Sequence, residues 1–109
     1  MTEYNCLGDL LRRLDRWPYL RIESRTQGLI LRVRDVVVGT LSLDTRVLSV
    51  DVPARSEVSP LEAHPPLRRT KDGVTVHVTD VDSRAAAEAL LRWRIALEQF
   101  AWQLRAASP

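Results

Sequence analysis

Two histidines are the side chains here whose ordinary pKa lies near neutral pH, so acid–base chemistry would depend on them first. His64 lies in a proline-bounded segment, His64-Pro65-Pro66, and His77 lies in an alternating strand pattern. Loops carry catalytic residues more often than strand interiors do, which makes His64 the preferred candidate for a general base. An exposed loop histidine without a chemical role is the alternative interpretation.

Motifs for other chemistries are missing from the sequence. It contains no metal-ligand spacing, nucleophile elbow, Walker loop or dinucleotide fingerprint. We therefore expect no metal and no cofactor.

The single cysteine, Cys6, excludes an intramolecular disulfide and favours a reducing compartment. No apolar run is long enough for a membrane helix, and the first residues lack a signal-peptide pattern, so we expect a cytoplasmic protein with no membrane segment.

A second group of chemically active side chains falls on one face of the predicted sheet. Strand alternation places on it Arg21, Glu23, Arg25, Arg32, Arg34, Thr40, Ser42, Thr75, His77 and Thr79. Arginines grouped around a histidine and hydroxyls suit an anionic ligand. The predicted ligand-binding residues are Arg32, Arg34, Thr40, Ser42 and His77.

Two other interpretations of this face stay open. It is a solvated surface if cross-strand Arg–Glu pairs satisfy its charges. It is a dimer or partner interface if Ile30, Val36 and Val38, which the alternation also places there, are exposed. Nucleic acid is disfavoured, because the net charge is only +2 and no stripe of aromatic residues follows the strands.

Hydrophobic periodicity predicts the elements that position these residues. The spacing predicts a first helix over 7–16, ended by Pro18, and a short helix over 56–63. Residues 67–70 read as an edge strand or an extended loop. Clear strand patterns cover 19–25, 29–34, 36–43, 47–52 and 73–79. In the strand over 36–43, Val37, Leu41 and Leu43 are predicted to point inward.

A long C-terminal helix is predicted over 83–106, capped by Asp82 or Ser83. Its core stripe is predicted to consist of Ala86, Leu90, Trp93, Leu97, Phe100 and Leu104. Ile95 and Trp102 fall off this stripe, and Trp102 is the helix's one indication of a partner.

These elements predict a single α+β domain over residues 1–109. The order is α-β-β-β-β-α-β-α, and the sheet is mostly antiparallel with about five strands. An N-terminal helix and a long C-terminal helix are expected to cover one face, in two layers.

Several short segments together resemble a family of small bacterial proteins. These are Trp17-Pro18, residues 39–43, Val50-Asp51-Val52-Pro53, His64, Gly73-Val74 and Leu90-Leu91-Arg92. They resemble the "luciferase domain" family, which is common in actinobacteria and about a hundred residues long. Family members often carry histidines in the Gly-x-Leu strand, where this chain has Thr40 and Ser42, and a tryptophan where it has Val74.

The resemblance implies a small-molecule ligand, with His64 and Asp51 as the catalytic positions carried over from the family. The family is named for similarity to a fungal luciferase, an oxygenase that acts on a hydroxypyrone-like luciferin. A cofactor-independent oxygenase or another small-molecule enzyme is therefore one expectation. The residues leave open whether the ligand is only bound or also converted. The alternative is a non-catalytic dimeric interaction module that uses the exposed sheet face.

Overall fold

The computed structural model describes residues 5–52, 66–71 and 73–107. Within them, two helices flank a run of strands whose tight turns follow the polar turn residues of the sequence. The elements are α1 (Cys6–Asp15), β1 (Leu20–Arg25), β2 (Gly28–Val33), β3 (Val36–Ser42), β4 (Val47–Asp51), β5 (Leu67–Arg69), β6 (Gly73–His77) and α2 (Val81–Ala107). The helix predicted over 56–63 and the candidate base His64 lie outside the described residues.

The strands form one antiparallel sheet in the order β1-β2-β3-β4-β6-β5. Each pair of neighbours is antiparallel, which confirms the predicted α+β class. Residues 67–70 contribute β5, a three-residue edge strand that pairs with β6.

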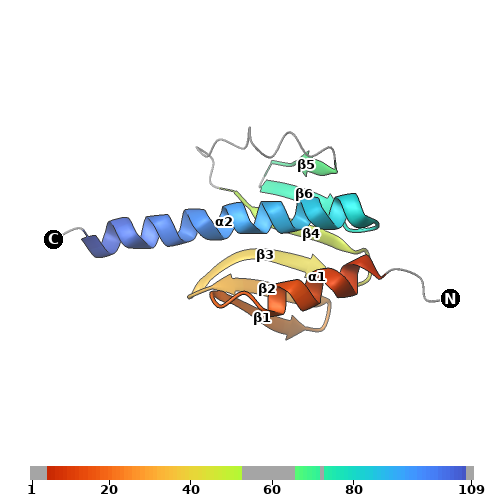
Figure 1. Cartoon of the computed structure of the whole chain (residues 1–109), viewed down its shortest axis with the longest axis horizontal. Helices are drawn as coiled ribbons and strands as arrows, with labels where there is room; N and C mark the ends of the chain where they lie inside the picture. The colour runs from red at the N-terminus through yellow and green to blue at the C-terminus, as the bar shows by residue number, and fades with distance from the viewer. Residues whose placement is uncertain (1–4, 53–65, 72, 108–109) are drawn as a thin grey trace.

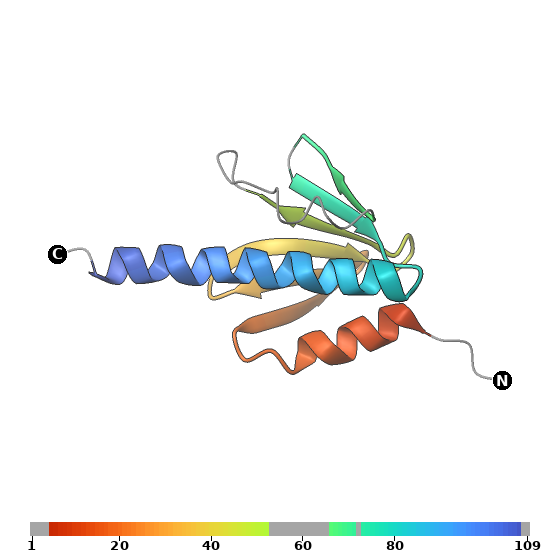
Figure 2. The ribbon, with the colours of Figure 1, turned by 45° about the horizontal axis from the view of Figure 1, so that its top comes forward.

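Both helices lie on the same face of the sheet (Figures 1 and 2). The core between the two layers consists of buried side chains from α1, α2 and the inward side of the strands, including Leu10, Leu14, Leu31, Leu48 and Leu91. No described helix is long and apolar enough to cross a membrane. Neither described helix covers the opposite sheet face, and we call it the open face.

The inward side chains of β3 differ from those predicted. Val38 is fully buried, whereas Val37 and Leu43 are exposed. The register shifts here, because Leu31 pairs with Gly39 but Arg32 pairs with Val37, which leaves Val38 as an extra residue. Such a bulge reverses the alternation along a strand, and simple period-two counting cannot foresee it. Val36 and Val38 therefore pack against the core and do not face solvent on the open face.

The buried stripe of α2 also differs from the predicted one. Its buried positions are Ser83, Ala86, Ala87, Leu90, Leu91, Arg94 and Ile95. Phe100 and Leu104, predicted to be core, are 60% and 58% exposed. The reason is that α2 extends past the end of the sheet, so none of the described strands lies beneath its last turns (Figure 1).

The N-terminus of α2 is capped two residues before Asp82, the first of the two predicted caps. Asp80 is the cap: its Oδ1 accepts from the Ser83 backbone N–H at 2.8 Å, and the Ser83 Oγ accepts from the Asp80 N–H at 2.9 Å. This reciprocal arrangement is a capping box with serine in the usual place of glutamate. These hydrogen bonds hold the pKa of Asp80 below its ordinary value of 3.8, the bond from the Ser83 backbone contributing most.

A ring of ion pairs joins α1 to α2. Asp9 lies 3.1 Å from Arg13 and 3.4 Å from Arg84, and Glu88 lies 3.5 Å from Arg13 and 3.1 Å from Arg84. The Arg84 Nε faces the Asp9 carboxylate without hydrogen-bond alignment. Within this ring, each of the four groups has one partner of opposite charge on its own helix and one on the other helix. Asp9 also lies 3.9 Å from Arg12. These ion pairs hold α1 against α2.

Candidate ligand site on the open sheet face

The open face carries a row of polar side chains that runs directly across the strands. Thr40 on β3 is opposite Ser49 on β4, and Ser49 is opposite Thr75 on β6. Directly opposite residues share a face, with Cβ atoms about 4.5–5.5 Å apart. We call these three residues the hydroxyl row. Their neighbours along each strand, such as Leu48, Val50 and Val74, point into the core.

The hydroxyl row lies in a hollow of about 330 Å³. The hollow is lined by Val37, Gly39, Thr40, Ser49, Val50, Asp51, Thr70, Gly73, Val74 and Thr75. Two glycines help to form it. A Cβ atom at Gly39 would lie 2.8 Å from the Ser49 carbonyl oxygen, and one at Gly73 would collide with the Val50 carbonyl oxygen. Side chains are therefore excluded at both positions.

Asp51, carried over from the family resemblance, does lie at this hollow. It ends β4 and pairs with Gly73, so no side chain stands opposite its carboxylate on β6. Its backbone carbonyl accepts a hydrogen bond from the Nε of Arg94 on α2, at 2.6 Å. A buried arginine on the helix layer thus fixes the end of β4 at the edge of the hollow.

Of the predicted ligand residues, Thr40 is the one that lines this hollow. Ser42 lines a neighbouring hollow of about 370 Å³ beside Gly28, and its Oγ accepts from the Thr45 N–H at 3.3 Å. His77 is exposed and pairs with Val47, two residues along β6 from Thr75, and it lines neither hollow.

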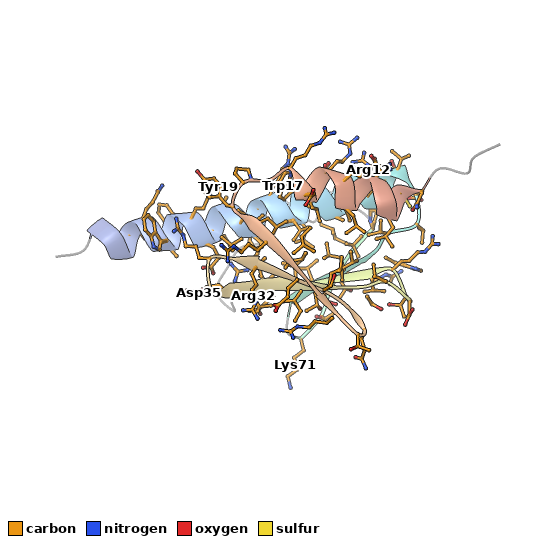
Figure 3. All side chains as sticks on the ribbon, turned by 90° about the horizontal axis from the view of Figure 1, so that it is seen from below. Arg12, Trp17, Tyr19, Arg32, Asp35 and Lys71 are labelled. Carbon is orange, nitrogen blue, oxygen red and sulfur yellow. The ribbon has the colours of Figure 1, made fainter. Side chains whose placement is uncertain are left out.

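Arg32 and Arg34 are engaged elsewhere. The Nε of Arg32 lies 3.0 Å from Glu23 Oε2, and Arg25 binds the other carboxylate oxygen at 2.7 Å. Hydrogen bonding from Arg32, reinforced by the charges of both arginines, lowers the pKa of Glu23 below its ordinary value of 4.5. Figure 3 shows Arg32 on the side of the sheet away from the helices.

Arg34 does not share the open face, contrary to the prediction. It occupies the turn after β2 with φ of 58°, a left-handed conformation that takes its side chain out of the strand alternation. Its guanidinium lies 3.8 Å from the ring centroid of Trp102 on α2. Trp102 was predicted to indicate a partner protein, but here it contacts Arg34 of the same chain.

Ser49 and Thr70 are the site residues that sequence reasoning missed. Ser49 was detectable, because it alternates with the inward Leu48 and Val50. Thr70 could not be detected, because its position depends on how β5 pairs with β6. Its N–H and Oγ1 both donate to the Gly73 carbonyl oxygen, at 2.8 and 3.2 Å.

A third hollow, of about 260 Å³, lies on the helix side between α2 and the residues that precede β1. Trp17, Tyr19, Ile95 and Ala96 line it, and its one cation, Arg92, lies 5.5 Å from the Trp17 ring centroid. This groove is mainly apolar, with Arg92 and Gln99 as its polar side chains, whereas the open-face hollow brings several hydroxyls and the Asp51 carboxylate together.

No group of three His, Cys, Asp or Glu side chains that could hold a metal ion occurs in residues 5–52, 66–71 and 73–107. Comparisons with protein-family models, with curated proteins and with solved structures gave no match. The luciferase-domain resemblance therefore stays a prediction.

Proposed function

We propose that this protein binds a small organic molecule in the open-face hollow. The observation that carries the proposal is the hydroxyl row, which aligns Thr40, Ser49 and Thr75 on three adjacent strands inside one hollow. The proposal agrees with the ligand-binding role that the family resemblance implies.

The lining supplies complementary polar groups. Each hydroxyl donates one hydrogen bond and accepts others, whereas the Asp51 carboxylate oxygens act as acceptors. A ligand with hydroxyl, carbonyl or amide groups spaced about one strand apart, close to 5 Å, matches this pattern. Val37 adds an apolar surface at the same hollow, against which a ring or a short chain can pack.

The proposal concerns binding first. A conversion step would need a proton acceptor, and Asp51 is the titratable side chain that lines the hollow in the described part of the chain. Catalysis is therefore a separate question, which turnover of a bound ligand by wild type and by Asp51→Asn would answer.

Ligand screening with matched variants tests the binding proposal. Library compounds that shift the backbone amide resonances of the hollow in ¹⁵N-labelled protein are titrated into Thr40→Val, Ser49→Ala and Thr75→Val. These variants keep side-chain size or strand preference and remove only the hydroxyl. Each should weaken binding about 2- to 10-fold, the equivalent of a lost hydrogen bond.

The control is Ser24→Ala, an exposed hydroxyl on β1 that lines none of the three hollows. It should leave every affinity unchanged. Hits whose affinities do not respond to any of the three hydroxyl-row variants would contradict the proposal.

A second candidate function is self-association through the C-terminal part of α2. Ala96, Phe100 and Leu104 are exposed at i, i+4 and i+8, where α2 extends past the sheet (Figure 2). Such a stripe matches itself in an antiparallel helix pair. Phe100→Ser with Leu104→Ser should abolish any dimer seen by light scattering, whereas Val81→Ser, an exposed apolar residue at the other end of α2, should not.

A further inference from the structure

A single register row on the open face runs across all the described strands. It consists of Glu23, Ile30, Thr40, Ser49, Thr75 and Arg68. The hydroxyl row forms its middle. Glu23 lies at one end and Arg68, on the edge strand β5, at the other, directly opposite Thr75.

The two ends of this row differ in their charge balance. At the β1 end, Glu23 is bound by Arg25 and Arg32, so its carboxylate is fully engaged. At the β5 end, Arg68 is exposed and has no ion-pair or hydrogen-bond partner among the described residues. Lys71 lies close by in sequence and also points away from the helices (Figure 3).

Among the described strand residues, Asp51 is the acidic group nearest to Arg68 in the strand register. It belongs to the next row on the open face, opposite Gly73, and is two strands away from Arg68. No ion pair joins the two side chains. Arg68 does not line the hollow itself, but it is directly opposite Thr75, which does. Its guanidinium is therefore available to a group of the ligand that extends from the hollow toward β5.

We propose that the ligand of the hollow carries an oxyanion, a carboxylate or a phosphate monoester, that Arg68 binds. This inference rests on the proposed function and names the chemical class of its ligand. The planar guanidinium matches both kinds of oxyanion with paired N–H donors. Strand spacing places Thr75 about 5 Å and Thr40 about 14 Å from the Arg68 backbone, so the anion binds at the β5 end while the rest of the ligand extends along the hydroxyl row.

The chain offers a matched control for Arg68. Arg69 is the next residue on the same short strand and is also exposed, but it pairs with Val74 and so belongs to the opposite face. Substitutions Arg68→Gln and Arg69→Gln change the net charge equally. Only the first should affect a ligand on the open face.

The test uses three probes with one ring and different head groups: 4-hydroxybenzoate, phenyl phosphate and 4-hydroxybenzamide. Each is titrated into the full ¹⁵N-labelled chain while the amide resonances of Ser49, Gly73 and Thr75 are followed. At least one anion should bind roughly tenfold more tightly than the neutral amide, because charge-assisted hydrogen bonds are about twice as strong as neutral ones. Arg68→Gln should remove that preference, and Arg69→Gln should preserve it.

The relative affinities of the benzoate and the phosphate show which oxyanion is preferred. If the amide binds the hollow as tightly as both anions, the oxyanion inference is overturned while the binding proposal stands. An anion preference lost equally in Arg68→Gln and Arg69→Gln also overturns it, since it would reflect net charge alone. If no probe shifts these resonances at 20 mM, a concentration on the order of weak fragment binding, the inference fails, and the library screen then decides the binding proposal separately.

Discussion

The Nε of Arg94 donates a 2.6 Å hydrogen bond to the backbone carbonyl of Asp51, linking the middle of α2 to the end of β4. The same guanidinium binds Glu98 at 2.7 Å, and the Arg94 side chain is only 4% exposed. The helix layer is therefore connected by one buried charge to the edge of the open-face hollow.

We expect Arg94→Met to destabilise the fold by about 2–4 kcal/mol, because it leaves the Asp51 carbonyl and the Glu98 carboxylate without their buried donor. The midpoint of urea unfolding measures this. Arg12→Met, at an arginine that is 73% exposed and 3.9 Å from Asp9, should change the free energy of unfolding by less than about 0.5 kcal/mol. Equal effects of the two substitutions would show that the Arg94 contact is not stabilising.

Ser83→Ala should cost about 1–2 kcal/mol, because the buried Ser83 hydroxyl accepts from the backbone N–H groups of both Thr79 and Asp80. Ser83→Thr keeps the hydroxyl and should lose less. Thermal unfolding followed by circular dichroism distinguishes the two variants, and equal losses would argue for tight packing at this position instead of capping.

The capping carboxylate of Asp80 predicts a defined pH dependence. Its pKa is lower in the folded chain than the ordinary value of 3.8, so the folded state binds fewer protons. Its contribution to stability is thus present above that ordinary value and is lost as the pH falls through the lower folded pKa. Asp80→Asn should reduce the slope of stability against pH in this acidic range, and an unchanged slope would contradict the assignment.

The pKa of Glu23 should move with Arg32. In the folded chain the hydrogen bond from Arg32 lowers this pKa below 4.5. An NMR titration of the side-chain carboxyl carbon should show the pKa rising in Arg32→Gln. Arg21→Gln, opposite Arg32 on β1 but without a described bond to Glu23, should change it far less.

Arg46→Gly should stabilise the protein by about 0.5–1 kcal/mol, because Arg46 holds φ of 60°, where a non-glycine residue is strained. Val78 N–H donates to the Arg46 carbonyl at 2.9 Å, a backbone bond that the substitution retains. Asp44→Gly in the same turn, at a position without positive φ, should instead be neutral or destabilising. Denaturant unfolding of both variants checks the difference.

Local patterns were enough to predict the α+β class, the helix at the N-terminus, the strands and the long final helix. Apolar spacings of three and four residues or of two residues reflect burial on one side of an element, and this burial needs no knowledge of the partner. For the same reason Leu41, predicted to point inward, is buried.

Only the tertiary structure decided which polar residues meet. The bulge at Val38 depends on how β2 and β3 pair, and it reverses the faces of Val36 and Val37 relative to the predicted ones. The end of the sheet, which no periodicity encodes, left Phe100 and Leu104 exposed. The row from Thr40 through Ser49 and Thr75 to Arg68 joins residues far apart in sequence, because strand register sets side-chain neighbours and is fixed by the packing of the whole sheet.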